Sequence, residues 1–115
     1  MGYREAIMGT SLIFCIDVDG TLCSLTSNQE YHFAKPNTLV IKMVNKLYDA
    51  GHYIKIFTAR GMASGKDFEG ITERQLKEWD VKYHELIMSK PSADYYIDDK
   101  GVSPEEFVNT VWNMN

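Results

Sequence analysis

Residues 13–22 read IFCIDVDGTL, and this stretch decides both the fold and the chemistry expected of the 115-residue chain. An apolar run, residues 12–16, leads straight into two carboxylates, Asp17 and Asp19, and then into Gly-Thr. Like charges this close repel each other, and each resists leaving water unless a cation or a proton offsets it. We therefore expect a positive group beside Asp17 and Asp19.

Length and composition fit one globular domain, so residues 1–115 are expected to form a single domain. The net charge of −4 and the scattered placement of the twelve Lys and Arg residues disfavour a nucleic-acid-binding surface. No targeting or membrane-spanning segment is visible, which predicts a cytoplasmic protein without a membrane partner. Cys15, within the apolar run, is expected to be a small buried hydrophobe.

Helical and strand patterns alternate along the chain. Strand patterns cover residues 12–16, 53–57, 85–88 and 95–97, and helical spacing of apolar residues covers 36–51, 68–79 and a segment that begins at Ser103. The continuous apolar character of the first strand is typical of a strand covered on both faces. These patterns predict the fold class α/β, a three-layer Rossmann-like parallel sheet with helices on both faces and right-handed crossovers.

Polar side chains stand where each predicted strand ends. Asp17 and Asp19 follow the first strand, Thr58 the second, Lys90 the third and the Asp98-Asp99 pair the fourth. Ligands of parallel sheets bind outside the carboxyl ends of the strands, where these residues would converge. Capping by an Asp pair is an alternative at one strand end, but it does not explain a second acidic pair at another. The pattern predicts a divalent-cation site with a hydroxyl and an ammonium group beside it for an anion.

The same four motifs resemble the signature of haloacid dehalogenase-like hydrolases. They are Asp17-Val18-Asp19-Gly20-Thr21 after a hydrophobic strand, Thr58, Lys90 before Pro91, and Asp98-Asp99, and they occur in that order across residues 12–112. Within the superfamily the chain is most similar to small capless phosphatases linked to polysaccharide biosynthesis. The resemblance implies a phosphatase that works through an aspartyl-phosphate.

The resemblance also implies a role for each catalytic residue. Asp17 is the nucleophile that forms the aspartyl-phosphate, and Asp19 protonates the leaving group and then activates water. Thr58 would hold a phosphoryl oxygen, and Lys90 would bind phosphate and keep Asp17 as a carboxylate. Further residues placed around the substrate are Gly20, Thr21, Ala59 and Arg60.

The implied cofactor is Mg²⁺. Its expected ligands are Asp17, the backbone carbonyl of Asp19, and the Asp98-Asp99 pair, of which Asp99 is the expected direct ligand and Asp98 is direct or linked through water. A magnesium ion would neutralise the charge of a phosphate monoester and orient it toward the nucleophile.

Spacing leaves no room for a cap domain between the motifs. A loop, residues 22–35, is expected to roof the site, with Tyr31, His32 and Phe33 either lining its entrance or only anchoring the loop. A homo-oligomer that covers the open site is a further expectation. Arg60 either reaches a substrate anion or pairs with a surface acid, and the sequence favours neither.

The sequence thus predicts a magnesium-dependent phosphatase for a small phosphorylated metabolite, with a sugar phosphate as the first choice. One alternative is a phosphatase for nucleic-acid ends, which an open site allows and the net charge disfavours. Another is a non-catalytic, phospho-accepting signalling module. That class also gathers Asp, Thr and Lys at strand ends, but the spacing of Asp17 and Asp19 and the late Asp98-Asp99 pair fit it poorly.

Overall fold

A computed structural model describes residues 11–113 as an α/β fold. In chain order the elements are β1 (Ile13–Asp17), the short 3-10 helix η1 (Tyr31–Phe33), α2 (Thr38–Asp49), β2 (Tyr53–Phe57), α3 (Glu69–Glu78), β3 (Glu85–Ile87) and α4 (Pro104–Trp112). The strands form one parallel sheet in the order β1-β2-β3, which confirms the predicted fold class of a parallel sheet with helices packed against it. No helix among the described residues is long and apolar enough to cross a membrane.

Side chains cap the first turns of two helices, α2 and α4. The Asn37 side chain accepts a hydrogen bond from the Val40 N–H, so α2 begins two residues after Pro36. The Ser103 hydroxyl accepts from the Glu106 N–H and Pro104 occupies the first turn of α4, as the sequence predicts. The apolar stripe of α2 then packs on the sheet, and Val40, Val44 and Leu47 are buried.

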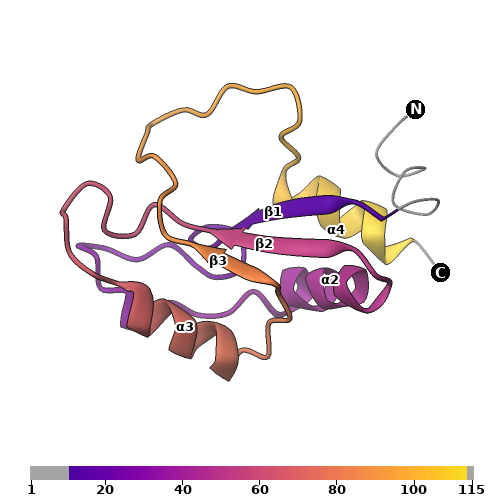
Figure 1. Ribbon diagram of the computed structural model, residues 1–115, viewed down its shortest axis with the longest axis horizontal. Coiled ribbons are helices and arrows are strands. Elements are labelled where there is room, and N and C mark those ends of the chain that lie inside the picture. Colours follow the sequence, from indigo (N-terminus) through magenta and orange to yellow (C-terminus); the bar gives the residue numbers. More distant parts are fainter. Residues whose placement is uncertain (1–10, 114–115) are drawn as a thin grey trace.

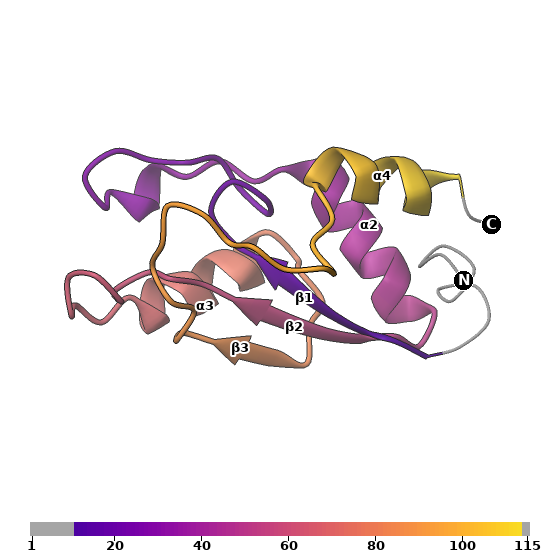
Figure 2. The same cartoon turned by 90° about the horizontal axis from the view of Figure 1, so that it is seen from above.

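The helices cover one face of the sheet. Strands that are neighbours in chain order and joined by right-handed crossovers place both connecting helices on the same side, and Figure 1 shows α2 and α3 together below the sheet. Ile16, Ile54 and Ile56 on that side are buried. Helix α4 packs against α2 beside β1, as Figure 2 shows from above.

The opposite face of the sheet is not covered by a helix of the described chain. Ile13 pairs in register with Tyr53, and their exposed fractions are 65% and 37%. Cys15, on the same face, is also exposed. The predictions that β1 is covered on both faces, that helices lie on both faces and that Cys15 is buried are therefore wrong in this part of the fold, because all crossovers run in one direction along the sheet.

The predicted fourth strand, residues 95–97, is not formed. These residues belong to a long loop between β3 and α4 that arches over the carboxyl edge of the sheet (Figure 1). Local contacts hold the loop instead: the Tyr96 hydroxyl donates to the Pro91 carbonyl at 2.5 Å, and the Asp98 side chain accepts from the Lys100 N–H at 2.6 Å. The β-branched and aromatic composition of the segment predicted a strand, but the backbone pairs with no strand here.

Candidate active site

Three loops meet at the carboxyl edge of the sheet. They are the 18–37 loop that contains η1, the loop after β2, and the loop after β3 (Figure 2). Between Asp19 and Thr58 the chain contains only η1, α2 and β2, so no inserted domain stands over this edge within the described residues. The edge is where the sequence predicts the catalytic residues.

Asp17 ends β1 and faces Lys90. The Lys90 Nζ lies 3.3 Å from Asp17 Oδ2, and Asp17 Oδ1 accepts a hydrogen bond from the Val18 N–H at 2.9 Å. The Asp17 side chain is 32% exposed and that of Lys90 is 11% exposed. This pair supplies the positive group that the sequence requires beside the carboxylates, and it leaves Asp17 accessible to a ligand.

Thr58 follows β2 and links the loops after β2 and β3. Thr58 is 1% exposed. Its hydroxyl oxygen accepts a hydrogen bond from the Arg60 N–H at 3.1 Å, and its carbonyl oxygen accepts one from the Lys90 N–H at 3.1 Å. A hydroxyl that accepts in this way can still donate its hydrogen to an anion. The structure therefore brings Asp17, Asp19, Thr58 and Lys90 to one edge, as the sequence predicts.

A tight turn carries the chain from Asp17 into residues 22–35, the loop that the sequence predicts to roof the site and that is called the flap below. The Val18 carbonyl accepts from the N–H groups of Thr21, Leu22 and Cys23. Gly20 has φ +86°, a conformation that side-chain-bearing residues rarely adopt. Gly20 is exposed and Thr21 and Ala59 are half-buried at this edge, which is compatible with the predicted substrate contacts.

Asp19 is held by a buried arginine. Arg60 Nη2 donates to Asp19 Oδ1 at 2.8 Å and Arg60 Nε donates to Oδ2 at 2.9 Å, the two-pronged geometry of a strong ion pair. Arg60 Nη1 donates to Thr72 Oγ1 at 3.0 Å and to Gln75 Oε1 at 2.6 Å. Because its side chain is 0% exposed, Arg60 neither reaches a substrate anion nor pairs with a surface acid; it fixes the orientation of Asp19.

The arginine also connects Asp19 to the flap. The Tyr31 ring of η1 lies 4.4 Å from Arg60 Cζ and packs edge-on against Phe68. Gln75 donates from Nε2 to the Tyr31 carbonyl at 2.7 Å. Tyr31 is therefore an anchor of the flap. Sequence reasoning missed Thr72 and Gln75; the available signal was a polar Gln within the apolar stripe of 68–79.

The predicted metal ligands are not gathered together. Asp98 and Asp99 lie exposed on the loop before α4, and no group of three or more acidic, histidine or cysteine side chains within residues 11–113 is placed to hold a metal ion. Asp17 and Asp19 instead have cationic side chains as partners. The side chains in this arrangement do not fit a magnesium ion, because Asp98 and Asp99 form no metal-binding group with Asp17 and Asp19 among the described residues.

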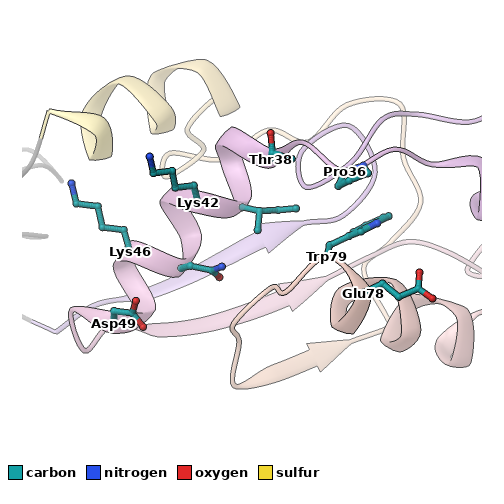
Figure 3. Close-up of a pocket in the computed structure, with 9 residues that line it drawn as sticks. Pro36, Thr38, Lys42, Lys46, Asp49, Glu78 and Trp79 are labelled. Atoms are coloured by element: carbon teal, nitrogen blue, oxygen red, sulfur yellow. The ribbon is translucent and has the colours of Figure 1, made fainter.

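A cavity of the described chain lies away from this edge. It has a volume of about 730 Å³ and is bordered by residues of α2, by Pro36 and by Glu78 and Trp79 at the end of α3 (Figure 3). None of the predicted site residues lines it. At the carboxyl edge of the sheet the Asp17 side chain is 32% exposed, and no inserted domain covers it within the described residues.

Burial of Asp17 has a measurable consequence for stability. Desolvation raises the pKa of the Asp17 carboxyl above its usual value of 3.8, although Lys90 opposes the shift. A pKa raised in the folded state favours folding at low pH, and that contribution is lost as the pH rises through the folded-state pKa. We expect Asp17→Asn to raise the melting temperature by a few degrees at pH 7.5, and the gain to shrink toward pH 4.

Thermal melts of Asp17→Asn and wild type across this pH range measure the effect. Asp49→Asn is the matched control, because Asp49 also pairs with a lysine, Lys82, but its side chain is 59% exposed. Asp49→Asn should show no such gain. A melting temperature of Asp17→Asn below that of wild type at pH 7.5 would contradict the prediction.

Loss of Arg60 is expected to cost stability. Arg60→Met leaves Asp19, Thr72 and Gln75 without their shared donor, and breaking one side of a buried ion pair typically costs about 3–5 kcal/mol. Since the Asp19 side chain is 21% exposed, we expect a loss of about 3 kcal/mol in the free energy of unfolding, measured by urea denaturation.

The exposed ion pair between Lys82 and Asp49 is the reference for this experiment. Lys82→Met should cost less than about 1 kcal/mol, because both side chains of that pair are about half exposed. If Arg60→Met and Lys82→Met lost the same free energy of unfolding, the buried network around Arg60 would add no more to stability than an exposed ion pair does.

Comparison with known proteins supports the fold assignment. No protein-family model and no curated protein matches the chain. A structural-genomics target from Vibrio cholerae is 29% identical with a TM-score of 0.77, and the match covers 90% of this chain and 89% of that one. A chain of the Pnkp1/Rnl/Hen1 complex is 27% identical, with a TM-score of 0.54 over 76% of this chain.

A second structure, of the Pnkp1/Rnl/Hen1 RNA repair complex, matches at 26% identity and a TM-score of 0.54 over 75% of this chain. Only 30% and 27% of those two chains are covered, so this chain spans less than a third of their length. The similarities are consistent with a haloacid dehalogenase-like fold.

Proposed function

We propose that this protein is a phosphatase that hydrolyses a small phosphomonoester through a phosphate ester of Asp17. The observation that carries the proposal is the placement of Asp17 at the open edge of the sheet, with Lys90 Nζ 3.3 Å from one oxygen and Asp19 fixed nearby by Arg60. The fold also resembles phosphatase domains. Asp17, Lys90 and Asp19 supply a nucleophilic carboxylate, an ammonium group for phosphate and a second carboxyl group for proton transfer, which are roles that two-step phosphate transfer uses.

In the first step an Asp17 oxygen attacks phosphorus and the bond from phosphorus to the leaving oxygen breaks. Lys90 and the Thr58 hydroxyl hold the non-bridging phosphoryl oxygens. Asp19 enters this step protonated, gives its proton to the leaving alkoxide, and is left as a carboxylate that Arg60 holds. In the second step Asp19 takes a proton from water, the hydroxide attacks phosphorus, and the bond between Asp17 and phosphorus breaks. Inorganic phosphate leaves and Asp17 is regenerated.

Arg60 serves these steps without contacting the substrate. Its two bonds to Asp19 fix both carboxylate oxygens, and its bonds to Thr72 and Gln75 fix the guanidinium in turn. A proton donor held in one orientation needs no reorganisation when the leaving oxygen departs. In this proposal Arg60 is a positioning residue.

Magnesium dependence stays a prediction from the resemblance. The described geometry does not gather its expected ligands, so no step above passes through a metal. The predicted homo-oligomer and cytoplasmic location are likewise proposals. A sugar phosphate stays the first prediction for the substrate, and similarity to chains of an RNA repair complex favours a second candidate, a phosphatase for nucleic-acid ends.

A substrate screen tests the proposal. Phosphorylated metabolites and p-nitrophenyl phosphate are incubated with the protein in Mg²⁺, in Ca²⁺ and in a chelator, and released phosphate is measured. Turnover of at least one phosphomonoester supports the proposed activity, and loss of turnover in chelator supports the metal requirement separately. Stable phosphorylation without phosphate release would instead favour the phospho-accepting signalling module.

A further inference from the structure

An aromatic side chain stands beside the phosphate-binding lysine. The Lys90 Nζ lies 4.1 Å from the centre of the Tyr96 ring and 4.6 Å from that of Phe57, so the ammonium group is placed between two rings and Asp17. Cation–π contacts of this kind fix the position of the charge. Tyr96 thus belongs to the immediate surroundings of the proposed reaction centre.

The Tyr96 ring is both fixed and open. Its hydroxyl donates to the Pro91 carbonyl at 2.5 Å, which sets the ring orientation, and yet the residue is 50% exposed. An ordered aromatic ring that keeps half its surface in water can serve as a stacking platform at low entropic cost. The neighbouring side chains Tyr95 and Ile97 are 83% and 93% exposed, so this part of the loop is unusually apolar for a free surface.

The leaving group of a bound substrate comes within reach of this ring. A phosphoryl group held by Lys90 and attacked by Asp17 lies next to the nitrogen that is 4.1 Å from the ring centre. A flat group joined to that phosphate through a ribose is therefore within reach of Tyr96. The flap carries another exposed ring, Phe33, whose centre lies 4.1 Å from that of the His32 ring.

We propose that Tyr96 is a specificity residue that stacks on the base of a nucleoside phosphate, so that the substrate is a nucleotide or a nucleotide at the end of a strand. This inference rests on the proposed phosphatase function and narrows its substrate class. Every nucleobase offers a flat face, and stacking on an aromatic side chain is typically worth about 1–3 kcal/mol per base. A plain sugar phosphate has no such face and gains nothing from the ring.

Two substrates that differ only in the base test the proposal. Ribose 5-phosphate and adenosine 5′-monophosphate share the ribose and the phosphate, so the ratio of their kcat/KM values isolates the base. We expect wild type to prefer the nucleotide by roughly 5- to 150-fold. Tyr96→Leu should bring the ratio close to one, whereas Tyr96→Phe and Tyr96→Trp should keep it.

Tyr95→Leu is the control, because it removes an exposed ring from the same segment and leaves the Tyr96 ring beside Lys90 in place. Its ratio of kcat/KM values for the two substrates should match that of wild type. A ring that only steadies Lys90 would lower both kcat/KM values together, so an unchanged ratio in Tyr96→Leu would overturn the inference. So would equal rates of wild type on the two substrates. If Tyr96→Leu fails to fold, the ratios of Tyr96→Phe and Tyr96→Trp decide, and loss of the preference in both would count against stacking.

A single-stranded oligonucleotide with a terminal phosphate distinguishes the two sources of the base. Faster turnover of the oligonucleotide than of the mononucleotide supports a strand end, and the reverse supports a free nucleotide. The net charge of −4 leads us to expect the mononucleotide to react faster. Failure to hydrolyse even p-nitrophenyl phosphate would refute the phosphatase function itself, and this inference with it.

Discussion

Asp17→Asn is expected to abolish turnover, with kcat lowered by at least ~10³-fold on every substrate. An amide is a poor nucleophile, and it also removes the charge that holds Lys90 at 3.3 Å. The exchange keeps the size of the side chain and the hydrogen bond that position 17 accepts from the Val18 N–H can persist. The loss should therefore come from chemistry rather than from misfolding.

Two measurements on one sample check this expectation. Phosphate release from p-nitrophenyl phosphate gives kcat, and mass spectrometry of acid-quenched protein shows whether phosphate is attached. Asp49→Asn, an exposed carboxylate that also pairs with a lysine, should keep wild-type values. Turnover by a folded Asp17→Asn variant within tenfold of wild type would mean that another residue is the nucleophile.

Much of the fold follows from short apolar patterns. The strands 13–17, 53–57 and 85–87 fall where hydrophobic runs predict them, and the helices differ from their predicted ranges by a few residues. These elements are decided locally, since each run buries its own apolar side chains against the same sheet. Asp17, Asp19, Thr58 and Lys90 meet because each follows a strand, and parallel strands end at one edge.

The sequence did not reveal the partners that tertiary packing supplies. Arg60 follows Thr58 by two residues, and nothing in this spacing says that its guanidinium turns inward to Asp19, Thr72 and Gln75. Thr72 and Gln75 lie on α3 and Asp19 follows β1, so only the tertiary packing of these segments brings them together around Arg60. The burial of Arg60 answers a question that the sequence left open.

The loop after β3 is where local pattern and structure disagree most. Residues 95–97 have strand composition, but a strand needs a neighbour, and here the Tyr96 ring packs on Lys90 while its hydroxyl holds the Pro91 carbonyl. Asp98 and Asp99 lie exposed on the same loop, and they form no metal-binding group with Asp17 and Asp19 among the described residues. In this loop conformation the Tyr96 ring lies beside Lys90, at the proposed reaction centre.

Asp19→Asn is expected to separate the two chemical steps, because the proposed mechanism gives Asp19 a different task in each. Attack of Asp17 on p-nitrophenyl phosphate needs little help from an acid, since p-nitrophenolate leaves readily without a proton. Hydrolysis of the Asp17 phosphate needs a base to take a proton from water, and an amide cannot do so. We expect that second step to slow by ~10²–10⁴-fold, so that phosphate accumulates on Asp17.

Rapid quench followed by mass spectrometry of peptides locates the phosphate. The variant also weakens the contact with Arg60, so Thr72→Val is the matched control: it removes one Arg60 partner, at 3.0 Å, and leaves both Asp19 oxygens and their charge in place. If disturbance of the network around Arg60 were the cause, Thr72→Val would accumulate phosphate as well. We expect accumulation in Asp19→Asn alone, because only that change removes the base. Phosphate found on residue 19 of wild type, or equally fast release by Asp19→Asn and wild type, would show that Asp17 and Asp19 do not divide the reaction between them in this way.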